Sequence, residues 1–254
     1  MAGIDIDLKG KRALVTGGSR GIGRAIAVRL AEAGCDVAIN YLRNRGQAEE
    51  TAAAVEQAGT RALLHKCNVA SGDDLGAMFE AISQSFGGLD ILVSNAASGV
   101  IKPAMELTPR HWQWTMDINA AALLPLAQRG VPLMPNGGHI IAVSSLGARR
   151  AIPNYAAVGA SKAALESLVR HLAIELAPQG VLVNAVSAGV VDTDALKHFP
   201  NRDQLLGESA RRTPRGRLTE PADVADAVLF LVSPLASMMV GQTIIVDGGY
   251  SIMG

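Results

Sequence analysis

A phenol and an ammonium stand seven positions apart in the segment Pro153–Lys162, where a helix-forming run begins. The run continues from Ser161 to about Ala177 and stops before Pro178. Residues seven apart on a helix lie on nearly the same face, about 10 Å apart along the axis, so Tyr155 and Lys162 can line one side of a ligand. Taken alone, the segment fits a packing role for Tyr155 and a solvent-exposed Lys162 better than a catalytic role. The rest of the chain favours the catalytic role.

Length and composition indicate a globular α/β protein. The chain has 254 residues, of which 49% are apolar and only 4% aromatic, and it can bury a substantial core. Its 23 basic and 23 acidic residues balance to a formal charge of zero, without a basic block. Neither a nucleic acid nor an anionic membrane surface is therefore an expected partner.

The cysteines, the histidines and the first nine residues point to a cytoplasmic protein. Cys35 and Cys67 have neither metal-ligand spacing nor the number for a disulfide framework, which favours a reducing compartment. Residues 1–9 carry acids where an export signal has basic residues, and no apolar run approaches the ~18 residues of a membrane span. No metal site is expected, because the histidines share no ligand spacing: His65, His111, His139, His171 and His198.

A glycine-rich turn joins the first predicted strand to the first predicted helix. The strand is Arg12–Thr16, the turn reads Gly-Gly-Ser-Arg-Gly-Ile-Gly over residues 17–23, and an amphipathic pattern covers Arg24–Ala33. In this context the glycines let backbone amides approach a pyrophosphate, which then sits at the positive end of the helix. The turn predicts nucleotide binding.

Strands and helices continue to alternate along the chain. Further strands are expected at 36–41, 61–67, 89–94, 139–144, 181–186 and 242–247, and further helices at 47–57, 73–86, 105–128, 161–177 and 221–232. We expect Ser71 or Asp73 to cap the helix at 73–86, and Pro125 to bend the helix at 105–128. The pattern predicts a single domain over residues 1–254: a Rossmann-type, doubly wound, seven-stranded parallel sheet with helices on both faces. The least regular stretch, about 190–218, is the candidate substrate loop.

Five motifs in order resemble the short-chain dehydrogenase/reductase superfamily over essentially the whole chain. They are Thr16–Gly23, Asn95-Ala96-Ala97, Asn119 within a helix, Ser145 after the fifth strand, and Ser161-Lys162-Ala163-Ala164. The resemblance implies an oxidoreductase that uses a nicotinamide dinucleotide, with Tyr155, Lys162, Ser145 and Asn119 as its catalytic residues.

One departure from the superfamily pattern narrows the expected reaction. The usual Tyr-x-x-x-Lys spacing requires tyrosine at position 158, where this chain has Val158. The usual spacing of seventeen from Ser145 to Lys162 survives, so the phenol has moved three residues upstream to Tyr155. Tyr41 and Tyr250 fall at a strand end and near the C-terminus, which leaves Tyr155 as the candidate phenol. Tyr-x6-Lys is similar to enoyl-acyl-carrier-protein reductase III, as are Asn95–Val100, His111–Trp114 and Asp192–Asn201.

This resemblance implies reduction of the trans-2 double bond of an enoyl thioester. Tyr155 would stabilise the charge that collects on the thioester oxygen, and Lys162 would bind the nicotinamide ribose. Two roles stay open for Ser145, which binds the substrate or only shapes the pocket. Two stay open for Asn119, which kinks its helix to hold a water near Lys162 or only bonds a backbone carbonyl. Trp112 and Trp114 face opposite sides of their helix, so at least one should be core or subunit contact.

The expected cofactor is NADPH. The end of the second strand, Ile39–Arg43, lacks the acid that binds the ribose of NAD, and Arg20 and Arg43 are cations suited to a 2′-phosphate. The resemblance implies that the cofactor contacts these residues: Gly17, Ser19, Arg20, Gly21, Ile22, Gly23, Tyr41, Arg43, Asn68, Val69, Asn95, Ala96, Lys162, Gly189, Val191 and Thr193. A homotetramer is likewise implied by the family alone.

Arginines concentrate after the fifth strand and in the irregular stretch: Arg149, Arg150, Arg202, Arg211, Arg212, Arg215 and Arg217. They form either a solvated charged surface or a site that steers an acyl carrier protein or the phosphates of the acyl handle. The alternative reaction is that of a 3-oxoacyl or other carbonyl reductase. A non-catalytic NADPH-binding sensor would need neither Tyr155 nor Lys162. Whether the acyl group is carried by carrier protein or by coenzyme A is not encoded in these motifs.

Overall fold

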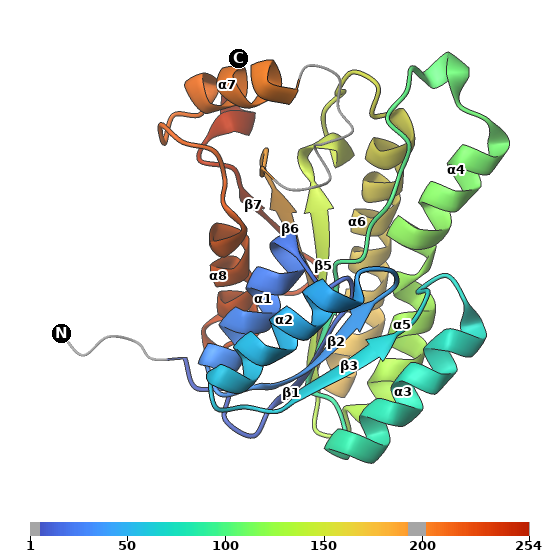
Figure 1. The fold of residues 1–254 in the computed structure, drawn as a ribbon, viewed down its shortest axis with the longest axis vertical. Coiled ribbons are helices and arrows are strands. Elements are labelled where there is room, and N and C mark those ends of the chain that lie inside the picture. The colour runs from blue at the N-terminus through green and yellow to red at the C-terminus, as the bar shows by residue number, and fades with distance from the viewer. Residues whose placement is uncertain (1–5, 193–201, 254) are drawn as a thin grey trace.

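The sheet is parallel throughout. The computed structural model describes residues 6–192 and 202–253, and within them seven strands form one sheet in the order β3-β2-β1-β4-β5-β6-β7 (Figure 1). The strands are β1 Arg12–Val15, β2 Asp36–Tyr41, β3 Ala62–Lys66, β4 Ile91–Ser94, β5 Gly138–Ser145, β6 Val181–Ala188 and β7 Thr243–Val246. This confirms the expected Rossmann-type fold.

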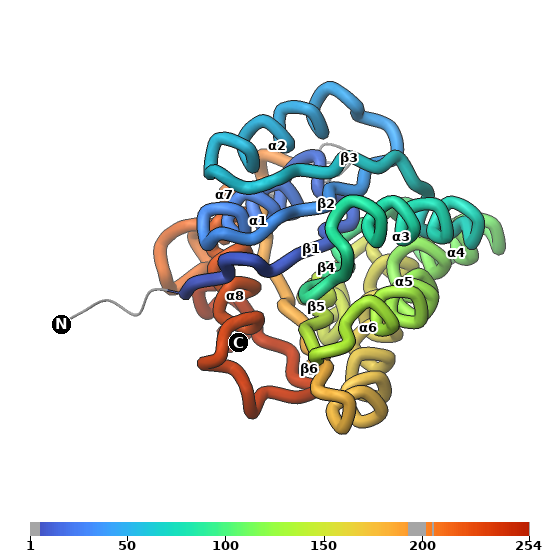
Figure 2. The backbone as a smooth tube through the Cα atoms, turned by 90° about the horizontal axis from the view of Figure 1, so that it is seen from below, coloured from blue at the N-terminus to red at the C-terminus, as the bar shows by residue number. Residues whose placement is uncertain are grey.

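Helices cover both faces of the sheet (Figure 2). They are α1 Gly21–Glu32, α2 Arg45–Gln57, α3 Gly72–Phe86, α4 Pro109–Met116, α5 Leu123–Gly130, α6 Ala156–Leu176, α7 Arg202–Arg212 and α8 Pro221–Leu231. Short 3-10 turns lie at Ala104–Glu106, Val131–Leu133, Leu146–Ala148, Ala177–Gln179, Pro234–Ala236 and Tyr250–Ile252. Helices α1, α2 and α8 share one apolar core with the sheet, while α3, α5 and α6 share the other.

The strands are apolar without a break because both of their faces are buried. In β1, Val15 packs into the core with α1 and α8, and its neighbour Leu14 packs into the core with α3, α5 and α6. The same alternation repeats in β5, where Ile141 and Ile140 face opposite cores. Continuous apolar runs therefore mark these strands in the sequence.

Two helix boundaries differ from the sequence-based expectation. The predicted bend at Pro125 is wrong, because Pro125 lies in the first turn of α5, where a missing N–H is tolerated. The break lies at Asp117–Ala121, a π-helical turn closed by a 3.0 Å bond from the Ala122 N–H to the Asp117 carbonyl. Helix α6 begins at Ala156 rather than Ser161, so Tyr155 is the residue that precedes its first turn.

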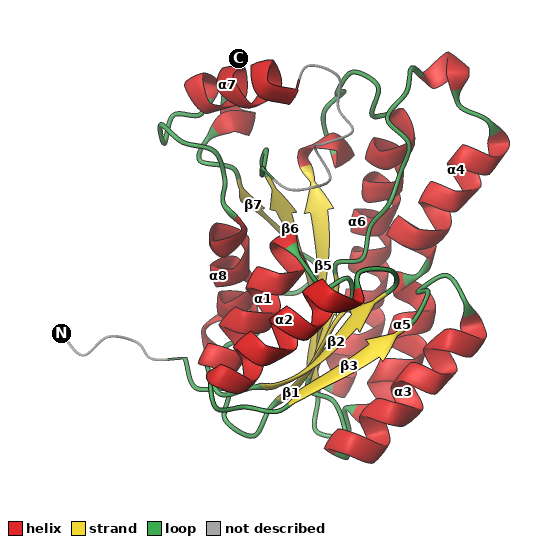
Figure 3. Ribbon diagram, viewed as in Figure 1, coloured by secondary structure: helices red, strands yellow, loops and turns green. Residues whose placement is uncertain are grey.

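The stretch expected to be irregular contains helix α7, which lies beyond the carboxyl end of β6 (Figure 3). Residues 193–201 lie outside the described part of the chain. The expected cap of α3 is confirmed at Ser71, whose hydroxyl accepts the Asp74 N–H at 3.3 Å. Among the described residues, no helix combines the length and the hydropathy needed to cross a membrane.

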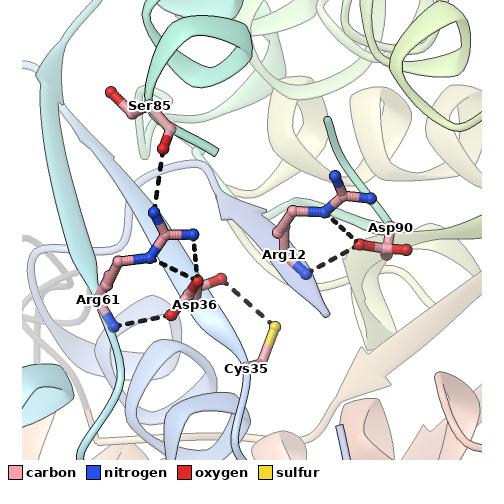
Figure 4. A network of polar contacts seen from close by, with 6 residues as sticks. All are labelled: Arg12, Cys35, Asp36, Arg61, Ser85 and Asp90. Atoms are coloured by element: carbon pink, nitrogen blue, oxygen red, sulfur yellow. Dashed lines mark hydrogen bonds and ion pairs between the residues drawn. The ribbon is translucent and has the colours of Figure 1, made fainter. Parts of the chain in front are cut away.

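Two carboxylates fix the strands at their amino-terminal ends, opposite the site (Figure 4). Asp90 accepts both the backbone N–H of Arg12, at 3.0 Å, and its Nε, at 2.7 Å, which fastens β1 to the residue before β4. Asp36 accepts the backbone N–H of Arg61 at 2.8 Å and its guanidinium at 2.6 Å, which fastens β2 to β3. The first pair joins strands that are far apart in the sequence, and the second joins consecutive strands of the sheet.

We predict that Asp90→Ala destabilises the protein, because it leaves the Arg12 N–H and guanidinium without their acceptor. Hydrogen bonds to a charged group contribute about 1.5–3 kcal/mol, which for a chain of this size corresponds to a fall in Tm of about 5–10 °C. Thermal denaturation followed by circular dichroism measures this. The control is Arg45→Ala, which breaks the exposed Arg45–Glu49 pair within α2 and should leave Tm unchanged. Equal shifts for the two variants would contradict a strand-fixing role for Asp90.

Candidate active site

A cleft of about 1020 Å³ opens at the carboxyl ends of the strands. It lies beyond the ends of the neighbouring strands β1 and β4, where the connections that follow them diverge. The chain leads from β1 to β2 on one side and from β4 to β5 on the other. At such a switch point the loops turn away from each other and leave room for a ligand. The volume is at the upper end for a single small-molecule site, so it can hold a cofactor and a substrate together.

In the glycine turn at residues 17–23, Gly17 and Gly23 leave no room for a side chain. A Cβ added at Gly17, whose φ is +63°, would lie 2.9 Å from the Ala96 Cα. A Cβ at Gly23 would lie 2.5 Å from the Asn95 amide and would also collide with the Gly17 carbonyl. Helix α1 begins at Gly21, so its N-terminal amides border the cleft. This cradle fits the pyrophosphate of a dinucleotide.

Three side chains, from β2 and from the residues directly after β1 and β4, hold this glycine turn in place. The Thr16 hydroxyl accepts the N–H of Asn95 at 2.9 Å and of Ala96 at 3.0 Å. The Asn95 amide donates to the Thr16 carbonyl at 2.9 Å and to the Gly17 carbonyl at 3.1 Å. Asn40, which the motifs did not single out, accepts the Gly17 N–H at 3.1 Å and donates to the Cys67 carbonyl at 2.9 Å. These bonds join β1, β2, β4 and the segment after β3.

The structure brings together the residues predicted to contact the cofactor. Those that line the cleft are Gly17, Ser19, Arg20, Gly21, Ile22, Gly23, Tyr41, Arg43, Asn68, Val69, Asn95, Ala96, Lys162, Gly189 and Val191. Thr193 lies outside the described residues. All of them except Lys162, which lies in α6, are at or after the ends of β1, β2, β3, β4 and β6, so the parallel sheet collects them at one edge.

Tyr155 and Ser145 meet on the wall of the cleft. The Tyr155 hydroxyl lies 3.4 Å from the Ser145 Oγ, which also accepts the Gly147 N–H at 3.1 Å. The ring rests on Gly147, where an added Cβ would lie 2.5 Å from the Tyr155 Cε1. Burial raises the pKa of the Tyr155 phenol above its usual value, and the hydrogen bond with Ser145 opposes that shift. The phenol is therefore held as a neutral donor.

Lys162 is a buried cation beside this pair. Its side chain is 5% exposed, and its Nζ donates to the Val143 carbonyl of β5 at 2.8 Å. Burial lowers the pKa of Lys162 from 10.5 to about 8. Only one of the three donors of the ammonium has a partner among the described residues, so the others can serve a ligand in the cleft.

Asn119 does not line the cleft. It lies in the π-helical turn with 3% exposure, where its Oδ1 accepts the Ser98 N–H at 2.8 Å. Its Nδ2 donates to the Ser161 hydroxyl at 3.0 Å, and Ser161 is the residue before Lys162. Neither bond goes to a backbone carbonyl. Asn119 thus ties the segment after β4 to helix α6.

Val158 fills the position where the superfamily has its usual tyrosine. It is 7% exposed, and a Cβ added at Gly99 would collide with its Cγ2. The segment after β4 and helix α6 therefore pack directly against each other through Val158 and Gly99. A side chain at position 99 would therefore displace Val158.

The other tyrosines also line the cleft, which corrects the argument that excluded them by sequence position. Tyr41 lies at the end of β2, and Tyr250 reaches the cleft from the C-terminal segment. Neither is paired with Ser145. Trp114 and Ile152 line the cleft as well, although no motif assigned them to it. So do Arg150 and Arg212, two of the arginines expected either on a charged surface or in a site that steers the acyl handle.

Glu166 is a buried acid one turn beyond Lys162. Its carboxylate accepts the Ser144 hydroxyl at 2.8 Å and the Arg149 guanidinium at 3.1 Å. These bonds tie both ends of the turn that carries Ser145 to helix α6. No local sequence pattern indicates this contact, because it depends on how β5 packs against α6.

We predict that the buried ammonium of Lys162 destabilises the cofactor-free protein in a pH-dependent way. Its folded pKa of about 8 lies below the ordinary 10.5, so its contribution opposes folding fully below pH 8 and fades as the pH rises towards 10.5. The Tm difference between Lys162→Met and the wild type should therefore shrink between pH 7 and pH 9.5, by an amount equivalent to about 2 kcal/mol. Lys66→Met, which changes an exposed lysine, should give no such pH-dependent difference from the wild type. A constant difference for Lys162→Met would contradict the prediction.

Comparisons with known proteins agree with this geometry. The family described as Enoyl-(Acyl carrier protein) reductase matches residues 17–251. The 1-cyclohexenylcarbonyl-CoA reductase of Streptomyces collinus is 41% identical over 242 residues, which cover 94% of this chain and 86% of that protein. The 3-oxoacyl-(acyl-carrier-protein) reductase FabG of Staphylococcus epidermidis is 35% identical over 241 residues, 94% of this chain and 98% of that protein.

Solved structures match over nearly the whole length. A 7α-hydroxysteroid dehydrogenase complexed with NADH and 7-oxo glycochenodeoxycholic acid aligns with a TM-score of 0.92 and 33% identity, covering 96% of each chain. A short-chain type dehydrogenase/reductase from Mycobacterium marinum aligns with a TM-score of 0.91 and 32% identity, covering 97% of this chain and 98% of that one. The resemblance in the motifs is confirmed: the chain belongs to the short-chain dehydrogenase/reductase family and is an oxidoreductase of that family.

Proposed function

We propose that the protein reduces the carbon–carbon double bond of a trans-2-enoyl thioester with NADPH as the hydride donor. The observation that carries this proposal is the position of the phenol. Tyr155 reaches Ser145 from the residue before helix α6, while Val158 fills the position of the usual tyrosine against Gly99.

The shifted phenol suits a reaction in which hydride and negative charge arrive at different atoms. In carbonyl reduction the same group receives both, since hydride adds to the carbon whose oxygen takes the proton. In conjugate reduction hydride adds to the β-carbon, and the charge collects on the thioester oxygen, which is three bonds from that carbon. Tyr155 precedes α6, three residues before Val158, so the phenol stands away from the usual position along the chain.

Tyr155 donates a hydrogen bond to the thioester oxygen as charge develops there. A donor that is already in place stabilises this charge without reorganisation, and the effect is largest where water is excluded. The raised pKa of Tyr155 keeps the phenol protonated at neutral pH, so the donor is present when the enolate forms. The α-carbon of the enolate then takes a proton, and the saturated thioester is released from the site as the product.

Ser145 and Lys162 support the phenol. Ser145 holds the Tyr155 hydroxyl in place, and the Gly147 N–H fixes the Ser145 Oγ in turn. Lys162, anchored to the Val143 carbonyl, presents its remaining donors to the nicotinamide ribose and adds positive potential behind the phenol. Asn119 positions α6 through Ser161 and does not contact the reacting atoms.

The cofactor supplies the hydride when bound. Its pyrophosphate would lie on the glycine turn at residues 17–23, and its adenosine ribose would lie between Arg20 and Arg43. Asp117 is the one acid among the described residues that line the cleft, and it belongs to the π-helical turn rather than to the end of β2. A 2′-phosphate therefore meets cations and no carboxylate at the end of β2.

The relatives support this reaction and also define the alternative. The Streptomyces collinus relative is named as a reductase of an unsaturated acyl-CoA, and the family description names an enoyl reductase. The Staphylococcus epidermidis relative is named as a 3-oxoacyl reductase, so carbonyl reduction is the second candidate. The residue at position 158 favours the first, because valine cannot donate a proton to a ketone.

We predict that Tyr155→Phe lowers kcat for a trans-2-enoyl thioester by about 10²-fold or more, the usual effect of losing one preorganised oxyanion donor. NADPH affinity should stay within about twofold, because the phenol acts on the substrate oxygen. Turnover is followed by NADPH absorbance, and affinity by cofactor fluorescence. Matched 3-oxoacyl thioesters should be reduced more slowly than enoyl thioesters by the wild type. Full activity of Tyr155→Phe, or faster reduction of the 3-oxoacyl substrate, would overturn the assignment.

We also predict a preference for NADPH over NADH of at least ~10-fold in kcat/KM, equivalent to about 1.4 kcal/mol. The preference should fall in Arg43→Ala through weaker use of NADPH, with little change for NADH. Arg45→Ala is the matched control, since Arg45 is two residues away, pairs with Glu49 and does not line the cleft. Equal use of the two cofactors by the wild type would contradict this prediction.

A further inference from the structure

The cleft is strongly positive although the chain as a whole is neutral. Among the described residues that line it, the cations are Arg20, Arg43, Arg150, Lys162 and Arg212, and the one carboxylate is that of Asp117. The formal charge of the chain is zero. Positive charge concentrated in a cleft focuses the field there and attracts anionic ligands.

The proposed cofactor uses part of this charge. Arg20 and Arg43 border the glycine turn and the end of β2, and Lys162 lies beside Tyr155. Arg150 and Arg212 remain without a role in that mechanism. Arg150 follows the turn after β5, and Arg212 ends helix α7, so two separate segments each bring one guanidinium to the same cleft.

Three of the other arginines in these segments are held in ion pairs, whereas Arg211 and Arg215, like Arg150 and Arg212, are in none among the described residues. Arg149 pairs with Glu166, Arg202 with Asp192, and Arg217 with Asp223. No ion pair among the described residues includes Arg150 or Arg212. Arg212 instead stacks over the ring of Tyr250, with 5.3 Å from its Cζ to the ring centroid, which orients a guanidinium without neutralising it.

Apolar side chains also line the cleft. Trp114, Ile118, Leu146 and Ile152 contribute them, and they suit an acyl chain and the aliphatic part of a handle. The side chains of Arg150 and Arg212 are exposed, whereas Tyr155 is partly buried and Lys162 is buried. A ligand with its thioester at Tyr155 would therefore present the far end of its handle to the two arginines.

We propose that Arg150 and Arg212 form a binding site for the phosphate of a phosphopantetheine thioester. This inference rests on the proposed function, since it places the thioester at Tyr155. Guanidinium groups bind phosphate through paired, charge-assisted hydrogen bonds, and arginines on two different segments can clasp one phosphate between them. Coenzyme A and a carrier protein both carry this phosphate on the pantetheine, so the proposed site would bind the group that they share.

The test compares one enoyl group on handles that differ only in the phosphate. The wild type is assayed with the trans-2-enoyl thioester of pantetheine, which has no phosphate, and with that of 4′-phosphopantetheine. We expect kcat/KM to be at least ~10-fold higher for the phosphorylated handle. In the double variant Arg150→Ala/Arg212→Ala this ratio should fall to about one, while reduction of the pantetheine thioester stays within about twofold.

Two further variants separate a phosphate site from general surface charge. Arg211→Ala removes an exposed arginine next to Arg212 that does not line the cleft, and it should keep the wild-type ratio. Arg150→Lys/Arg212→Lys keeps the charge but not the paired donors, and should recover only part of the ratio. A wild-type ratio near one, or an unchanged ratio in the double alanine variant, would overturn the proposal. Weaker NADPH binding with an unchanged ratio would assign the arginines to the cofactor instead.

Coenzyme A and carrier-bound thioesters distinguish the two sources of the phosphate. Equal kcat/KM for the 4′-phosphopantetheine and coenzyme A thioesters would show that this one phosphate is sufficient. A higher, salt-sensitive value for the carrier-bound thioester alone would show that the acidic carrier adds its own contact. If no enoyl thioester is reduced, the proposed reaction fails, and calorimetry with a saturated acyl-4′-phosphopantetheine still tests the site. Its binding should exceed that of acyl-pantetheine by at least ~10-fold, and equal binding would exclude the site.

Discussion

The parallel sheet is the constraint on which the rest of the structure depends. When neighbouring strands all run in one direction, each chain segment leaves the sheet at the same edge and returns through a helix. The loops after β1, β2, β3, β4, β5 and β6 therefore meet at one edge, and the divergence between β1 and β4 leaves a cleft there. The opposite edge carries the Arg12–Asp90 and Asp36–Arg61 pairs that fasten neighbouring strands. Stability and chemistry are thus placed at opposite ends of the same strands.

Within that cleft, the fold buries the ammonium of Lys162, although burial disfavours the charged form of a lysine. The Lys162 ammonium is buried beside the apolar core, and its lowered pKa shows that burial opposes the charged form. Its one protein acceptor is the carbonyl of Val143, a strand residue that cannot move independently of the sheet. A rigid backbone acceptor fixes the ammonium in place and leaves its other donors directed at a ligand. The same burial strengthens any hydrogen bond that Tyr155 makes to a developing anion.

The sequence was informative wherever a contact depends on a single strand, turn or helix. Apolar runs located the strands, and the glycines at 17–23 located the cradle, because both signals are local. Contacts between distant segments were not predictable in this way. The π-helical turn at Asp117–Ala121 accompanies bonds from Asn119 to Ser98 and Ser161, and Pro125 was the wrong local signal for it. Tyr250 was set aside by its sequence position, yet the C-terminal segment folds back and places it in the cleft.

The position of the phenol depends on how two loops pack. Ser145 and Lys162 both line the cleft, seventeen residues apart in the sequence. Tyr155 reaches Ser145 only because Gly147 leaves space for its ring, and Val158 occupies the alternative position only because Gly99 leaves space for its methyl group. Gly147 thus leaves room for the ring of Tyr155, and Gly99 leaves room for Val158. The specificity of the site is therefore a property of how the loops after β4 and β5 pack against α6, and not of Tyr155 alone.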